Sequence, residues 1–108
     1  MKLSEAGPLY IDIRKLEDYC LSPSHPRGRH KARVFARALG IVQRDAVWLR
    51  DRLLQYGPAA EVIEHETDQF GERLTADVAI SRQGRTAVIR SVWMVRDASV
   101  ILVTCWVL

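Results

Sequence analysis

The spacing of apolar residues changes at Gly57-Pro58, near the middle of the 108-residue chain. Before this point they recur every three or four residues, and after it they alternate with polar residues, as in LTADVAIS at residues 74–81. The first spacing is typical of helices with one buried face, and the second of half-buried strands. The chain is therefore predicted to be a single α+β domain over residues 1–108, with helices at about 12–57 and strands at about 59–108.

Three helices are predicted before this boundary. The first spans Asp12 to Cys20, with Asp12 as its N-cap, and a loop containing two prolines follows it. The second runs from about Gly28 to Leu39 and stops at Gly40, because glycine is a common residue just after a helix. The third runs from about Gln43 to Tyr56. Its buried face is expected to carry Val42, Ala46, Leu49, Leu53 and Tyr56.

Four strands are predicted after the boundary, at about 59–67, 74–81, 86–96 and 99–108. Gln83-Gly84 and Asp97-Ala98 mark tight turns, and residues 68–71 mark a looser one. Connections this short join antiparallel neighbours. The expected architecture is therefore about three helices packed on one face of a four-stranded antiparallel meander, with Trp48 and Trp93 in the core.

Apolar run lengths and cysteine usage point to a cytoplasmic protein. No apolar run approaches the length of a membrane span, and the N-terminus has no signal-like hydrophobic region. Cys20 and Cys105 are too few for a disulfide framework and lack CxxC spacing. We expect reduced thiols, no membrane partner and no cofactor.

A strongly basic segment, SPSHPRGRHKARVFARALG, runs from Ser22 to Gly40. Residues 1–57 hold 11 Lys/Arg against 6 Asp/Glu, whereas residues 58–108 hold 5 against 7. Such a cluster at the start of a helix suits an anionic ligand, most simply a phosphate, and a basic half suits contact with nucleic acid. Between Tyr19 and Ile41 no acidic residue occurs, and the charged residues besides two histidines are Arg27, Arg29, Lys31, Arg33 and Arg37.

Lys31 falls within the apolar face of the second helix, one turn before Phe35. A lysine in this position either extends its charge to the surface or meets a partner, so both a structural and a phosphate-binding or catalytic role are open. A separate stripe is formed by Arg29, Arg33 and Arg37, which are spaced four residues apart. Repulsion between like charges at this spacing destabilises a helix by about 0.2–0.5 kcal/mol per pair. The stripe is either a solvated face or a surface for an anionic partner.

His25 and His30 are candidates for proton transfer in the cleavage of an RNA phosphodiester. This reaction needs no metal, because a base removes the 2′-hydroxyl proton and an acid protonates the leaving 5′-oxygen. The alternative is that His25 only orders the loop before Pro26 and that His30 is a surface residue. A zinc site formed with Cys20 is weaker, because the spacing matches no established ligand pattern.

The strands contribute further candidates. A two-residue turn at residues 83–84 places Asp77 opposite Arg90, as a cross-strand ion pair or with Arg90 free to bind phosphate. Thr104 interrupts the apolar final strand, and Trp106 lies two residues further on. Thr104 is either a core hydroxyl or a hydroxyl that donates a hydrogen bond to a phosphate, beside a tryptophan that stacks on a base. Whether Thr104 and Arg90 share a face depends on the turn at Asp97, whose register the sequence leaves open.

The segments KLEDYCLSPSHPRGRHKARVFARALGI and LVTCWVL resemble a domain family of unknown function from bacteria and phages. The family occurs at the C-termini of phage head-morphogenesis proteins and polymorphic toxins, and as stand-alone proteins. Its pattern comprises Leu-x-x-Tyr-x-Leu, HPxGxxKAxxF, a Leu-Gly helix end, an Asp-x-x-Gly turn and a terminal Thr-Cys-aromatic. These positions are Leu16, Tyr19, Leu21, His25, Pro26, Gly28, Lys31, Ala32, Phe35, Leu39, Gly40, Asp68, Gly71, Thr104, Cys105 and Trp106.

The resemblance implies a fold similar to the barnase, EndoU, colicin and RelE group of metal-independent ribonucleases. By analogy with that group, it implies a phosphate site formed by Lys31, His25, Arg90 and Thr104, with His30 as a further candidate. Two features depart from the family: Trp106 stands where a tyrosine is expected, and the last hairpin, VRDASV, is shorter than usual.

We therefore expect a small endoribonuclease toxin of a toxin–antitoxin or polymorphic-toxin system, acting on tRNA or mRNA and neutralised by a cognate antitoxin or immunity protein. His25 or His30 would transfer protons. Lys31 and Arg90 would stabilise the phosphorane, and Thr104 would orient the phosphate. The expected substrate-binding residues are Arg27, Arg29, Arg33, Arg37 and Trp106. The alternatives are a non-catalytic nucleic-acid-binding module and an antitoxin or immunity-type interaction domain.

Overall fold

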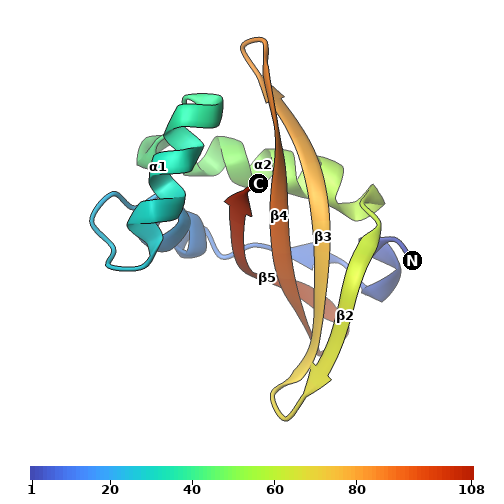
Figure 1. Cartoon of the computed structure of the whole chain (residues 1–108). Helices are drawn as coiled ribbons and strands as arrows, with labels where there is room; N and C mark the ends of the chain where they lie inside the picture. The colour runs from blue at the N-terminus through green and yellow to red at the C-terminus, as the bar shows by residue number, and fades with distance from the viewer.

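A computed structural model describes all of residues 1–108, and a five-stranded sheet forms its centre. The strands lie in the order β1-β5-β4-β3-β2, and α2 crosses behind them while α1 stands beside the end of β5 (Figure 1). The elements in chain order are η1 (Leu3–Ala6), β1 (Leu9–Tyr10), η2 (Leu16–Cys20), α1 (Gly28–Leu39), η3 (Gln43–Asp45), α2 (Ala46–Tyr56), η4 (Gly57–Ala59), β2 (Val62–Asp68), β3 (Gly71–Arg82), β4 (Arg85–Arg96) and β5 (Ser99–Val107).

The α+β class and the four predicted antiparallel strands, β2 to β5, are confirmed, but the sheet is mixed because it has a fifth strand that was not predicted. A fifth strand, β1, precedes the helices and pairs in parallel with β5, with Leu9 opposite Val100 and Tyr10 opposite Ile101. Two residues are too few to show an alternating pattern, so the sequence carries no periodic signal for this strand.

The predicted helices are present, and the first differs in form. α1 has the predicted bounds, and the third helix begins as η3 and continues as α2. Asp12 Oδ1 accepts a hydrogen bond from the backbone N–H of Arg14 at 3.0 Å, which supports its predicted capping role. The last turn, η2, is a π-helix, in which the N–H of Leu21 donates to the carbonyl oxygen of Leu16 at 2.8 Å. This wider turn changes the direction in which Tyr19 and Cys20 leave the helix.

The hydrophobic core lies between the helices and one face of the sheet, and it includes the fully buried Trp93 as predicted. Val42 and Tyr56 were expected on the buried face of the third helix, but they are 42% and 48% exposed. Trp48 is only half-buried, and the Arg82 guanidinium lies 4.9 Å from the centroid of its ring. Periodicity locates the buried face of a helix but not where that face ends.

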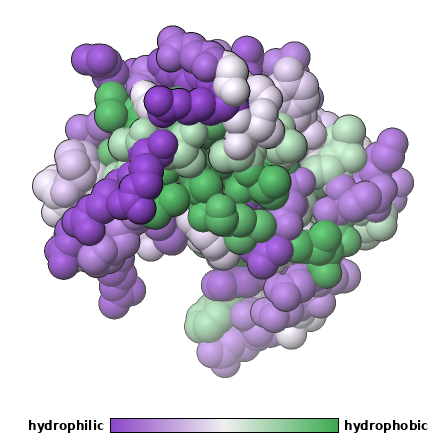
Figure 2. Space-filling view, turned by 45° about the horizontal axis from the view of Figure 1, so that its top comes forward, coloured by the Kyte–Doolittle hydropathy of each residue, from purple (hydrophilic) through white to green (hydrophobic).

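When the molecule is turned so that the top of the Figure 1 view comes forward, its surface shows apolar side chains gathered in the middle with hydrophilic side chains around them (Figure 2). Separately, none of the helices is both long enough and apolar enough to cross a membrane.

The buried hydroxyl of Ser91 joins two strands and a core tryptophan. Ser91 Oγ donates to the carbonyl oxygen of Ala76 at 2.6 Å and accepts from Trp93 Nε1 at 2.8 Å. We expect Ser91→Ala to lower the free energy of unfolding by about 2 kcal/mol, because a buried indole N–H then lacks an acceptor. Urea denaturation measures the change, and the exposed Ser81→Ala serves as a control with a loss below about 0.5 kcal/mol. Equal losses in the two variants would contradict this interpretation.

Candidate functional site

The Lys31 ammonium is the centre of a polar cluster formed by η2, α1 and β5. Its Nζ atom donates to Thr104 Oγ1 at 2.9 Å and to Tyr19 Oη at 3.1 Å. It also lies 4.6 Å from the centroid of the Tyr19 ring and 5.4 Å from that of the Trp106 ring. No carboxylate lies within ion-pair distance of Lys31. The charge is therefore oriented by hydroxyl groups and aromatic faces and remains available to an anion.

The approach of α1 to η2 depends on a glycine. A Cβ atom on Gly28 would lie 2.0 Å from the carbonyl oxygen of Tyr19, far inside van der Waals contact. Only glycine allows the first turn of α1 to pack directly on the backbone of η2. Because Lys31 lies one turn after Gly28, this contact brings its side chain to Tyr19. The spacing Gly-x-x-Lys thus has a steric reason.

The register of β4 and β5 decides which strand residues face the cluster. Thr104 lies opposite Val92 and Trp106 lies opposite Arg90, with a β-bulge between Val92 and Trp93. Directly opposed residues in antiparallel strands share a face of the sheet. Thr104 and Arg90 are therefore on the same face, which answers the question that the sequence left open.

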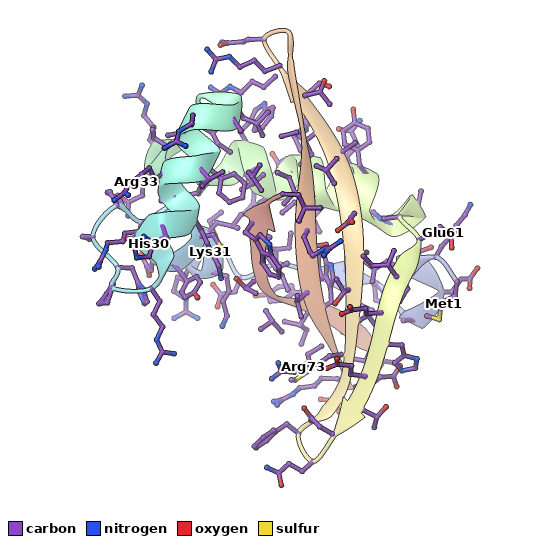
Figure 3. The ribbon with its side chains drawn as sticks, viewed as in Figure 1. Met1, His30, Lys31, Arg33, Glu61 and Arg73 are labelled. Atoms are coloured by element: carbon purple, nitrogen blue, oxygen red, sulfur yellow. The ribbon has the colours of Figure 1, made fainter.

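A pocket of about 290 Å³ borders the cluster and is lined by His30, Lys31, Val34, Trp106 and Val107. Lys31 extends from α1 towards β5, whereas Arg33 extends from the other side of the helix (Figure 3). His30 is exposed and lines the same pocket as Lys31. The pocket thus places an imidazole, an ammonium and an indole ring around one cavity.

His25 organises the loop before α1. Its Nδ1 atom accepts hydrogen bonds from the backbone N–H groups of Arg27 and Gly28, both at 3.0 Å. Its ring packs on Tyr19 with centroids 4.8 Å apart. These bonds satisfy two of the free N–H groups at the helix start and require the tautomer that carries hydrogen on Nε2. The contacts match the loop-ordering alternative, and Nδ1 is not free to act on a ligand.

Arg90 is held by an acidic neighbour. Arg90 Nε and Nη2 donate to the two carboxylate oxygens of Asp77 at 2.9 and 3.0 Å. This cross-strand ion pair is the one predicted from a two-residue turn at residues 83–84, and Arg82 lies opposite Arg85 as that turn requires. The pair occupies one edge of the guanidinium and neutralises its charge, so Arg90 contributes less to an anion site than its position suggests.

The remaining basic residues do not line the Lys31 pocket. Arg27, Arg29, Arg33 and Arg37 are exposed, and none has a carboxylate within 4.0 Å. The structure therefore brings together Lys31, Thr104, Trp106 and His30, but it places most of the arginine stripe elsewhere. It gathers no three potential metal ligands in one place, so Cys20, His25 and His30 do not form a candidate zinc site.

Two members of the cluster were not among the predicted site residues, namely Tyr19 and the thiol of Cys20. Cys20 Sγ lies 3.8 Å from Thr104 Oγ1. The hydrogen bond from the Cys105 thiol, aided by Thr104 and the Lys31 charge, lowers the pKa of Cys20 to about 6 against the opposing effect of burial. The same bond and burial raise the pKa of Cys105. Tyr19 occurs in the family pattern, but no spacing rule connects it to a lysine 12 residues later.

The structure is an α+β domain with a lysine-centred polar cluster beside the end of its last strand. The sequence matches the domain of unknown function DUF6883 over residues 2–108, and the chain belongs to this family. No curated protein sequence matches it. A solved structure with a similar fold is a chain of a contact-dependent growth inhibition toxin–immunity protein complex from Klebsiella pneumoniae 342. The TM-score is 0.72 at 18% identity, covering 91% of this chain and 98% of that chain.

We expect Gly28→Ala to separate α1 from η2 and to lower the free energy of unfolding by about 2–4 kcal/mol, because the added methyl group overlaps the Tyr19 carbonyl oxygen. Gly84→Ala is the control, since a Cβ there has no atom within 4 Å and only backbone strain of about 1 kcal/mol is added. Thermal denaturation measures both. A Gly28→Ala variant as stable as Gly84→Ala would contradict the close approach.

The lowered pKa of Cys20 predicts a pH dependence of stability. Because folding favours the thiolate, this contribution to the free energy of unfolding is complete above the unfolded thiol's pKa, near 9, and is lost as pH falls through about 6. The free energy of unfolding of the wild type relative to Cys20→Ser should therefore rise between these pH values. Chemical denaturation at a series of pH values measures the difference, and a constant difference would contradict the assignment.

Proposed function

We propose that this protein is a metal-independent endoribonuclease that acts as a toxin. The observation that carries the proposal is the Lys31 ammonium, which is held by Tyr19 and Thr104, is not neutralised by any carboxylate and borders an open pocket. A fixed, unpaired cation beside a cavity is suited to stabilise charge that develops on a phosphate in a transition state.

The proposed reaction is an internal transesterification of RNA. The 2′-oxygen forms a bond to phosphorus while the bond to the 5′-oxygen breaks, which yields a 2′,3′-cyclic phosphate and a free 5′-hydroxyl. His30, exposed in the pocket, accepts the 2′-hydroxyl proton. The Tyr19 hydroxyl, whose oxygen accepts from Lys31, donates its own hydrogen to the leaving oxygen. Lys31 stabilises the phosphorane.

Other residues of the expected site take supporting roles in this proposal. Trp106 stacks on a base next to the scissile phosphate, and Thr104 orients Lys31. His25 fixes the loop and the Tyr19 ring, and Arg90 braces the sheet through Asp77. Tyr19 provides the hydroxyl that the family pattern led us to expect at position 106, and it does so from a different element.

The assignment as a toxin, rather than as its neutralising partner, rests on the site. The similar fold found in a toxin–immunity protein complex is compatible with either component. A neutralising protein needs a complementary surface but no oriented lysine beside a pocket. The resemblance to the barnase, EndoU, colicin and RelE group adds support for ribonuclease chemistry.

Cleavage of total RNA and purified tRNA in the presence of EDTA tests the proposal. We expect cleavage by the wild type and a loss of at least about 100-fold in Lys31→Met, which keeps the length of the side chain but removes its charge. Tyr19→Phe should lose at least about tenfold. Lys15→Met makes the same chemical change at an exposed position outside the cluster and should retain full activity.

Three outcomes would overturn the proposal. RNA that stays intact with folded protein would exclude cleavage, and salt-dependent binding without cleavage would indicate a nucleic-acid-binding module. Equal activity in Lys31→Met and Lys15→Met would show that the Lys31 cluster is not the catalytic site. Inducible expression gives a further test, because a toxin arrests growth in a Lys31-dependent way and an immunity-type protein does not.

A further inference from the structure

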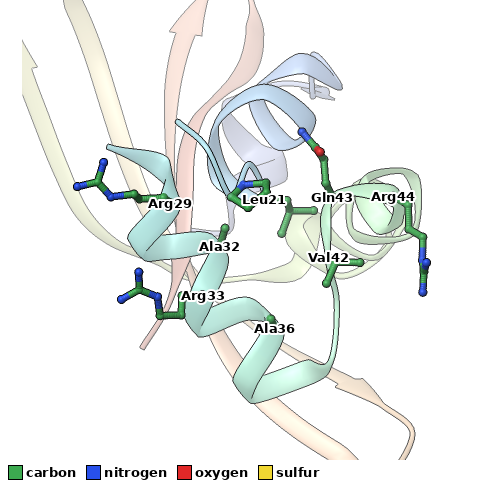
Figure 4. A pocket seen from close by; sticks show the side chains of 9 residues that line it. Leu21, Arg29, Ala32, Arg33, Ala36, Val42, Gln43 and Arg44 are labelled. Atoms are coloured by element: carbon green, nitrogen blue, oxygen red, sulfur yellow. The ribbon is translucent and has the colours of Figure 1, made fainter. Parts of the chain in front are cut away.

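A second surface feature, a groove of about 370 Å³, lies between α1 and the start of η3. Its floor is aliphatic and is formed by Leu21, Ala32, Ala36 and Val42 (Figure 4). Ala32 and Ala36 are one helical turn apart, so α1 contributes only methyl groups to the floor of the groove. Val42, predicted to be in the core, is instead 42% exposed here.

Arginines border this groove on both sides. Arg29 and Arg33 extend from α1 on one side and Arg44 extends from η3 on the other, all pointing outward from the floor (Figure 4). None of the three has a carboxylate within 4.0 Å or donates a side-chain hydrogen bond within the chain. The groove thus combines an apolar floor with unpaired positive charge on two opposite borders.

From this combination we infer that the groove binds an amphipathic helix of a partner protein, with apolar residues on one stripe and acidic residues on both sides of it. The alanines allow close approach of a helix backbone, and the acidic side chains reach Arg29 and Arg33 on one border and Arg44 on the other. Such pairs favour the correct partner and speed its association.

Nucleic acid fits this groove less well than a protein helix. The floor holds no aromatic ring on which a base could stack. Arg44 points away from Arg29 and Arg33, so the three arginines do not converge on one phosphate (Figure 4). The groove also lies on another side of α1 from the Lys31 pocket, and the two share no lining residue. The inference is therefore independent of the proposed ribonuclease activity.

Binding of synthetic peptides to the full chain tests the inference. The probe is a helical peptide of about four turns with leucines at i, i+3, i+4 and i+7 and glutamates beside them. Its controls are a scrambled peptide of the same composition and one with lysines in place of glutamates. We expect the probe to bind at least about tenfold more tightly than either control by fluorescence anisotropy, with NMR shift changes confined to residues of the groove.

Two substitutions assign the binding to the groove. Val42→Glu places a negative charge on the exposed part of the floor, and Arg33→Glu reverses the charge of one border. Each should weaken binding of the acidic probe at least about tenfold, whereas Arg96→Glu, an exposed arginine outside the groove, should change it less than about twofold. Circular dichroism confirms that each variant is folded.

The inference is overturned if the probe binds no better than the scrambled peptide, or if Val42→Glu and Arg96→Glu bind it equally well. It is also overturned if tRNA, and not the peptide, causes the NMR shift changes in the groove, since the occupant is then a nucleic acid. None of these readouts uses RNA cleavage, so failure here and failure of the ribonuclease proposal are distinguishable.

Discussion

The backbone contact between Gly28 and the Tyr19 carbonyl group determines where the main candidate site forms. It sets the first turn of α1 against η2 with no side chain between them, and Lys31 then reaches both Tyr19 and Thr104. The resulting cluster joins two helical segments to the last strand through one ammonium group. A cation fixed in this way loses little conformational freedom when an anion arrives, which is the condition for electrostatic catalysis.

The two sides of α1 present positive charge in different forms. On one side a single lysine is oriented by hydroxyl groups beside a pocket, and on the other side arginines border an aliphatic groove. A compact ammonium suits one developing charge, whereas arginines spread along a helix suit carboxylates spread along a partner. The basic segment of residues 22–40 therefore has two distinct surfaces, although it looks uniform in the sequence.

Features that depend on near neighbours in the chain were predicted correctly. The end of α1 follows from Gly40, and the Asp77–Arg90 pair follows from the turn at residues 83–84. Features that depend on contacts between distant segments were not predicted. Strand β1 is too short to show a pattern, Tyr19 meets Lys31 only after η2 docks, and the exposure of Val42 depends on the gap between α1 and η3.

The face on which Thr104 lies shows most clearly where the sequence alone is insufficient. A regular antiparallel pairing that continues from the two-residue turn at Asp97-Ala98 places Thr104 opposite Ser91. The Thr104 hydroxyl then points into the core. The β-bulge near Val103 adds one residue to β5, and Thr104 instead opposes Val92 on the face shared with Arg90. One extra residue exchanges the two faces of a strand.

By itself the sequence determined the α+β class, the three helices, the turns and the basic character of α1, because periodicity, end residues and charge act locally. Only the tertiary structure decided the bulge, the docking of η2 and the surroundings of Lys31, because these depend on packing between segments far apart in the chain.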